Sequence, residues 1–106
     1  MKKLVLCLLM TLAGCQSDAD RAISELNKGI EFAERGDPET AIACYTDAIR
    51  LDPTLAKAYA YRGIAFGKLG NHEKEITDYH EAIESNPKDI NSRYNRGVAY
   101  GEQDKY

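Results

Sequence analysis

Few residues of this 106-residue chain have types and spacing suited to catalysis or metal binding. His72 and His80 stand eight residues apart, about 12 Å along a helix, which is too far for both to bind one metal ion. His80 and Glu84 share a helix face, but a solvated pair is the simpler interpretation. The sequence contains no Ser-His-Asp order, no phosphate-binding glycine loop and no cysteine pair. We therefore expect no catalytic residue, no metal site, no cofactor and no small-molecule substrate.

The beginning of the chain has the order of a secretory signal. Lys2 and Lys3 precede an apolar segment, Leu4–Leu12, which is shorter than the roughly 20 residues needed to cross a bilayer. The sequence Leu12-Ala13-Gly14-Cys15 that closes it resembles the lipobox of bacterial lipoproteins. This resemblance implies that residues 1–14 are a signal peptide, that Cys15 carries lipid, and that residues 15–20 form a short tether.

The same resemblance implies a location. Several acyl chains, at about 0.8 kcal/mol per buried CH₂, would hold the protein on a membrane almost permanently. Gln16 follows the cysteine, and the absence of Asp there resembles lipoproteins sent to the outer membrane, facing the periplasm. An ordinary signal peptide with a chance cysteine is the alternative.

Charge and cysteine content limit the partners. Loss of Lys2 and Lys3 with the signal would change the formal net charge from −3 to −5, so we expect no binding to nucleic acid. With Cys7 removed and Cys15 bearing lipid, Cys44 would remain alone and could form no intramolecular disulfide. A lone thiol in a helix is either a small core residue or, less simply, a reactive group.

Much of the chain repeats at an interval of 34 residues. Gly29, Gly63 and Gly97 keep this spacing, and residues 22–55 laid over 56–89 share eleven identities in 34 positions. Apolar positions at three- and four-residue steps predict helices, with Gly and Pro between them. We expect helices over about 18–35, 38–51, 55–69, 72–85 and 89–103 and no strand, hence an all-α solenoid of antiparallel helix pairs.

These marks resemble the tetratricopeptide repeat (TPR), a helix-turn-helix unit of 34 residues. The first repeat would be 22–55, the second 56–89, and 90–106 a partial third. The residues that carry the resemblance occupy the family's positions for small, aromatic and proline residues: Gly29, Phe32, Ala41, Tyr45, Ala48 and Pro53, then Tyr59, Gly63, Phe66, Tyr79, Ala82 and Pro87. It implies that small residues let paired helices approach while aromatic rings fill the space between them.

Two departures from the family pattern carry predictions. Glu75 stands where Ala41 stands in the first repeat, so we expect a local widening there or a side chain that reaches solvent. Position 7 of the repeat is Lys28, Arg62 and Arg96. We expect either Arg62 or Arg96 to pair with Asp78 across the stack, because the first repeat lacks both partners.

The resemblance also implies an interaction surface, a concave groove lined by the first helix of each pair. Its apolar floor and mixed walls would suit an extended or helical peptide with apolar anchors. The alternative for each residue is simple packing within the stack. The residues expected to bind a partner are Leu26, Ile30, Lys57, Ala60, Ile64, Lys68, Asn91, Tyr94 and Val98.

One branch of the family grips a C-terminal carboxylate with Lys, Asn and Arg side chains at five positions of this groove. This chain has Leu26, Ile30, Tyr61, Asn91 and Asn95 there, so we do not expect that activity. Apolar groups cannot bind a carboxylate.

We therefore expect a lipid-anchored, non-catalytic TPR scaffold that binds a protein or peptide in the bacterial cell envelope. Two alternatives remain: a structural accessory subunit of an envelope assembly for secretion or peptidoglycan remodelling, and a fragment of a longer TPR lipoprotein. The third repeat favours the fragment, because Gly97 and Tyr100 belong to a face that expects a partner helix. A natural short form capped by its last helix is the other interpretation.

Overall fold

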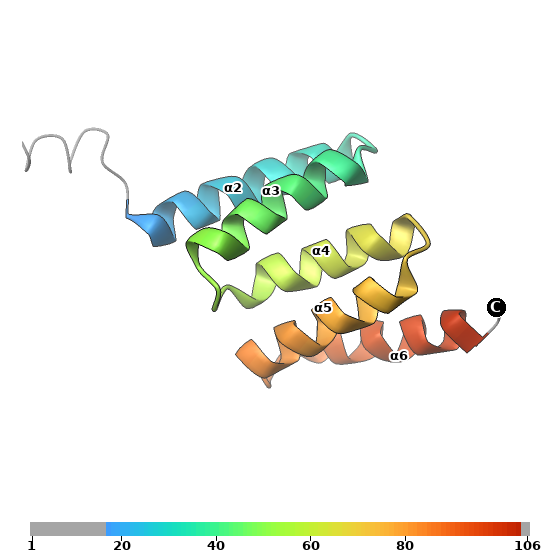
Figure 1. Cartoon of the computed structure of the whole chain (residues 1–106). Coiled ribbons are helices and arrows are strands. Elements are labelled where there is room, and N and C mark those ends of the chain that lie inside the picture. Colours follow the sequence, from blue (N-terminus) through green and yellow to red (C-terminus); the bar gives the residue numbers. More distant parts are fainter. Residues whose placement is uncertain (1–16, 105–106) are drawn as a thin grey trace, which may run out of the picture.

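The protein is a stack of five helices in a computed structural model that describes residues 17–104 (Figure 1). Each helix begins and ends within one residue of the range expected from the sequence, and the described residues form no strand. The predicted all-α fold is confirmed. Cys15 and the predicted signal segment lie outside the described residues. No helix between residues 17 and 104 is both long and apolar enough to cross a lipid bilayer. The helices are α2 (Asp18–Glu34), α3 (Pro38–Leu51), α4 (Ala56–Lys68), α5 (His72–Ser85) and α6 (Ile90–Asp104).

Local sequence explains where the helices begin and end. The side chains of Ser17, Asp37 and Asn71 each accept a hydrogen bond, of 3.2, 3.1 and 3.2 Å, from a backbone N–H in the first turn of the helix that follows. Gly36 and Gly70 follow the ends of α2 and α4 with φ of 81° and 80°, a conformation that side chains rarely adopt.

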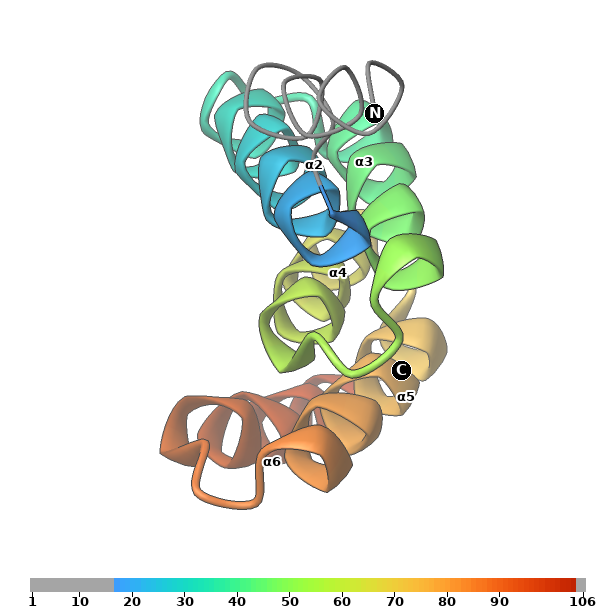
Figure 2. The same cartoon turned by 90° about the vertical axis from the view of Figure 1, so that its left-hand side faces the viewer.

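The helices form two layers. We call α2, α4 and α6 the A helices and α3 and α5 the B helices. Figure 2 shows the A helices along one side of the stack and the B helices along the other. Each helix packs on the next one in the sequence, and α2 also contacts α4. Residues of the three A helices therefore line one continuous surface.

Small residues make the close contacts between helices, as the repeat pattern predicts. An added Cβ at Gly63 would lie 2.9 Å from the ring of Tyr79, and one at Gly29 would overlap the ring of Tyr45. Each tyrosine ring therefore fills the space that a glycine leaves on the paired helix. The most buried apolar residues are mostly alanines, together with these two rings: Ala22, Ala41, Tyr45, Ala48, Ala58, Ala65, Tyr79, Ala82 and Ala99.

Glu75 differs from its expected placement. Its side chain does not extend to solvent: it is 12% exposed and lies against Gly67, where an added Cβ would overlap the carboxylate. One carboxylate oxygen lies 2.8 Å from Nδ1 of His72, and the other accepts a hydrogen bond of 3.0 Å from the hydroxyl of Tyr79. A glycine across the helix pair therefore accommodates the larger residue. The first repeat has Ala33 and Ala41 at the same two positions.

Candidate functional site

The surface shared by the A helices contains three adjoining clefts. The largest has a volume of about 490 Å³ and lies between the C-terminal halves of α2 and α4. Its floor is apolar, with Ile30, Tyr61 and Ile64, and its rim carries Glu34 and Lys68. A second cleft of about 460 Å³ lies between the N-terminal halves of the same helices, and a third of about 320 Å³ lies between α4 and the start of α6. We call these three clefts together the groove.

Seven of the nine predicted partner-binding residues line the groove. Ile30, Ile64 and Lys57 each line two of the clefts. Leu26 is only 5% exposed, so it belongs mainly to the core and forms the floor of one cleft. Four of the seven line a single cleft each, and they are Leu26, Ala60, Lys68 and Asn91.

Tyr94 and Val98 lie apart from the groove. They line none of the three clefts, and their exposed fractions are 72% and 47%. Ile30, Ile64 and Val98 stand 34 residues apart at equivalent positions of the three repeats. Neighbouring residues partly bury the first two, whereas Val98 is exposed. The role of Tyr94 and Val98 in partner binding stays a prediction.

Tyr61 is the groove residue that the sequence analysis did not select. It lines all three clefts, and its ring stacks on that of Tyr45 with centroids 6.0 Å apart and planes at 29°. The signal was present in the sequence, because the position of Tyr61 is one at which the carboxylate-binding branch places a ligand-contacting residue. Its exposed fraction of 38% leaves part of this large ring available to a ligand.

The charges at the groove are arranged around its apolar floor. Lys57 and Lys68 are exposed and stand eleven residues apart on α4, about 16 Å along the axis. Glu34 faces the same cleft as Lys68. Asp89 also borders the groove, but its carboxylate caps α6 by accepting hydrogen bonds of 3.2 and 2.7 Å from the backbone N–H and the hydroxyl of Ser92. Among the residues that line the three clefts, Lys57 and Lys68 carry the positive charges.

A partly buried ion pair joins the helices that carry this groove. Nε and Nη2 of Arg62 each donate a hydrogen bond of 2.8 Å to the carboxylate of Asp78, which confirms the predicted pairing for Arg62. These hydrogen bonds raise the pKa of Arg62 above its ordinary value. Nη1 of Arg62 donates a hydrogen bond of 3.3 Å to the hydroxyl of Thr46 on α3. Arg96 makes the corresponding contact one repeat later, with Nη1 lying 3.1 Å from Nδ1 of His80. Arg62 thus joins α3, α4 and α5.

Tyr45 keeps the wall between α2 and α4 uncharged. The residue is 1% exposed, and burial raises the pKa of its hydroxyl to about 12. It also borders the largest cleft of the groove. This wall therefore stays an uncharged aromatic surface well above neutral pH.

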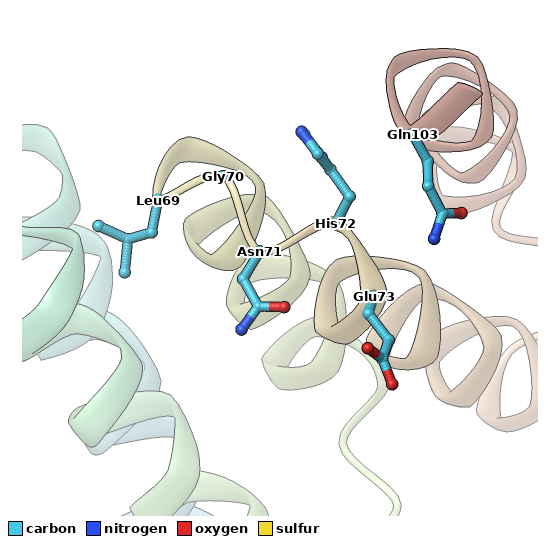
Figure 3. Close-up of a pocket in the computed structure, with 6 residues that line it drawn as sticks. All are labelled: Leu69, Gly70, Asn71, His72, Glu73 and Gln103. Atoms are coloured by element: carbon cyan, nitrogen blue, oxygen red, sulfur yellow. The ribbon is translucent and has the colours of Figure 1, made fainter. Parts of the chain in front are cut away.

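A larger hollow of about 690 Å³ lies outside the groove (Figure 3). It is lined by the turn between α4 and α5 and by Gln103 of α6. Figure 3 shows the side chains of Leu69 and Asn71 pointing away from Gln103. The Asn71 side chain already caps α5. This hollow therefore lacks convergent groups that would bind a ligand.

His80 and Cys44 are the other titratable residues weighed in the sequence analysis. No group of three or more His, Cys, Asp or Glu side chains there is placed to hold a metal ion. Nε2 of His80 lies 3.1 Å from the hydroxyl of Tyr100, and Nδ1 lies 3.1 Å from Nη1 of Arg96. Cys44 is free and partly buried, and burial raises the pKa of its thiol, which disfavours the reactive thiolate.

Comparison with known proteins identifies the repeats. A family profile described as TPR repeat matches residues 29–70, and one described as tetratricopeptide repeat matches residues 56–89. No curated protein matches the sequence significantly.

Solved structures match over most of the chain. One, described as the second TPR of Spaghetti (RPAP3) bound to HSP90 peptide SRMEEVD, is 32% identical over 86% of this chain and 84% of that one, with a TM-score of 0.81. Another, described as the first TPR of Spaghetti (RPAP3) bound to the same peptide, is 20% identical over 85% of this chain and 98% of that one, with a TM-score of 0.53. The second likeness concerns the fold alone.

Proposed function

Because this chain belongs to the tetratricopeptide repeat family, we propose that it is a non-catalytic scaffold that binds a segment of a partner protein in the groove of its A helices. The observation that carries the proposal is the apolar floor of the groove, where Ile30, Tyr61 and Ile64 line one cleft of about 490 Å³. Apolar side chains that border an open cleft lose water contact when a ligand covers them, which favours binding.

The chemistry of the groove indicates the type of ligand. The RPAP3 structures hold an HSP90 peptide that ends in an acidic sequence. Leu26, Ile30 and Tyr61 occupy three of the positions at which the carboxylate-binding branch uses polar or cationic groups. We therefore expect a segment with apolar or aromatic anchors, flanked by acidic groups that reach Lys57 or Lys68, and not a terminal carboxylate held by a cationic clamp.

The proposed scaffold is attached to a membrane by lipid on Cys15. Support comes from the sequence Leu12-Ala13-Gly14-Cys15 and from the distance to the fold, since α2 begins at Asp18. From Cys15 to Asp18 the chain advances three residues, which span at most about 10 Å when fully extended. The groove would therefore face partners close to the membrane surface, in the periplasm if the anchor lies in the outer membrane.

Site-specific photo-crosslinking in cells tests the groove. A photoreactive phenylalanine analogue replaces Lys57 or Lys68, and we expect each to capture the same partner. The matched controls place the analogue at Ala43 and Glu84, which are exposed on α3 and α5. Capture should fall when Ile64→Ser or Tyr61→Ser is added. Capture from Ala43 and Glu84 alone would instead favour a structural accessory subunit that uses the B helices.

Metabolic labelling tests the anchor separately. Cells that express the full chain are grown with radioactive palmitate, and we expect the protein to become labelled. The Cys15→Ala variant should remain unlabelled. Cys44→Ala is the matched control and should keep the label, since Cys44 is partly buried in the fold. Label retained in the Cys15→Ala protein would rule out the lipid site while leaving the groove proposal standing.

A further inference from the structure

The cleft of about 320 Å³ between α4 and the start of α6 is lined by two side-chain amides. Asn91 and Asn95 both reach it from α6. They are four residues apart, so they lie on one face of the helix, about 6 Å apart along its axis. Asn91 is exposed and Asn95 is partly buried, and no hydrogen bond joins either amide to another group within residues 17–104. Both amides can therefore bond to a ligand.

The remaining polar groups of this cleft have other roles. Asp89 and Ser92 form hydrogen bonds with each other, and Lys57 contributes a positive charge. A side-chain amide supplies one acceptor oxygen and two N–H donors. A peptide backbone offers the complementary groups, an N–H donor and a C=O acceptor in each residue. Two amides on one helix face are therefore suited to bind the backbone of a ligand, whatever its side chains.

The spacing of the two amides favours an extended ligand over a helical one. In an extended chain, alternate residues direct their backbone N–H and C=O to the same side, and they lie about 6.6 Å apart. This repeat is close to the separation of Asn91 and Asn95 along α6. A helical ligand bonds nearly all of its backbone groups internally, so it would leave the two amides without partners.

Tyr61 connects this polar cleft to the largest, apolar cleft of the groove. Its ring lines both clefts, and so does the side chain of Ile64. A segment that runs from the amides across α4 therefore passes the partly exposed ring of Tyr61 before it reaches the apolar floor.

We propose that Asn91 and Asn95 bind the backbone of an extended segment of the partner protein, and that this segment crosses Tyr61 into the apolar cleft. This inference rests on the proposed function and assigns a conformation to the ligand. The segment needs an apolar anchor for the floor and an acidic group for Lys57, which lines the same cleft as the amides. The residues that lie over the amides are free in sequence, because only their backbone is bound.

Backbone methylation of a bound peptide tests the inference. The probe is a peptide that the purified full chain, in detergent, selects from a displayed library of random dodecapeptides. Fluorescence anisotropy measures its dissociation constant, and N-methylation removes one backbone donor at a time. We expect methylation to raise the dissociation constant about tenfold at two positions that lie two residues apart.

Variants of the two amides assign these positions to the structure. Asn91→Leu and Asn95→Leu keep the side-chain volume and should each raise the dissociation constant about fivefold to tenfold. In each variant, methylation at the matching position of the peptide should have little further effect. Gln103→Leu removes an exposed amide of α6 outside the groove and is the matched control, with no change expected. Circular dichroism checks that all three variants remain folded.

The outcomes separate this inference from the scaffold proposal. Tighter binding of a peptide that contains α-aminoisobutyric acid, which favours the helix, would overturn the extended conformation. Amide variants that bind the probe like the parent protein would overturn the role of Asn91 and Asn95. In both cases a peptide still binds, so the scaffold proposal stands. A groove that neither selects a peptide nor captures a partner at Lys57 or Lys68 would overturn both proposals.

Discussion

Two hydrogen bonds of 2.8 Å join the guanidinium of Arg62 to the carboxylate of Asp78. Asp78 is 3% exposed, so its charge depends on this partner for compensation. Because Arg62 also contacts Thr46, the pair connects one B helix, through the A helix that carries the groove, to the next B helix. The shape of the groove therefore depends on a polar contact on the opposite side of α4.

Removing one member of this pair should destabilise the protein strongly. Arg62→Leu leaves a buried carboxylate without its cation, and we expect a loss of about 3 kcal/mol in the free energy of unfolding. The double variant Arg62→Leu/Asp78→Leu should lose about 1 kcal/mol or less, because no charge is then buried. Urea unfolding followed by circular dichroism measures both. Equal losses in the single and double variants would show that packing, and not charge compensation, sets the cost.

Equivalent glycines should respond oppositely to alanine. Gly63→Ala places a methyl group 2.9 Å from the ring of Tyr79 and 3.2 Å from the backbone oxygen of Glu75, so we expect a loss of about 1–2 kcal/mol. Gly97→Ala meets no atom within 4 Å and gains helix propensity, so we expect a gain of up to about 1 kcal/mol. Urea unfolding followed by circular dichroism measures both variants. A loss at both positions would contradict the open space at Gly97.

Gly67 and Glu75 should be coupled. Gly67→Ala alone forces the carboxylate of Glu75 out of its place, at a cost of about 1–3 kcal/mol. Adding Glu75→Ala recreates the Ala33 and Ala41 pair of the first repeat and should recover most of that loss. A double-mutant cycle in urea measures the coupling. Strictly additive effects would mean that the glycine is not there to accommodate the carboxylate.

Alkaline pH should destabilise the fold through Tyr45. Burial raises the pKa of this hydroxyl from 10.0 to about 12, so between these values the unfolded chain loses the proton and the folded protein keeps it. Stability is therefore full below pH 10 and falls by roughly 2 kcal/mol as the pH rises to 12. Tyr45→Phe should flatten this part of the stability curve, while Tyr94→Phe at an exposed ring should not change it. Burial also raises the pKa of Tyr79, so some dependence should remain.

The fold followed from the sequence because its determinants are local and repeated. Gly36 and Gly70 mark helix ends through a backbone conformation that few other residues adopt, and Asp37 and Asn71 cap the helices that follow. The pairing of Arg62 with Asp78 was also predictable, since the first repeat lacks both residues at once. Changes that occur together at two positions of one repeat indicate contact.

The placement of Glu75 was not predictable from its own position. A charged residue at a close helix contact suggested wider spacing, but the compensating change is Gly67 on the other helix, eight residues earlier. The role of Tyr61 was missed for a similar reason. Whether a ring at that position covers the core or borders the groove depends on the neighbouring clefts, which form only when three helices come together.

The exchange of Ala33 and Ala41 for Gly67 and Glu75 means that α2 cannot take the place of α4 beside α5 without a clash. A crossover within the duplicated segment that joined α2 directly to α5 would set the methyl group of Ala33 against the carboxylate of Glu75, and its product would fold poorly. Divergence at a single helix contact can in this way make two copies of one repeat impossible to interchange.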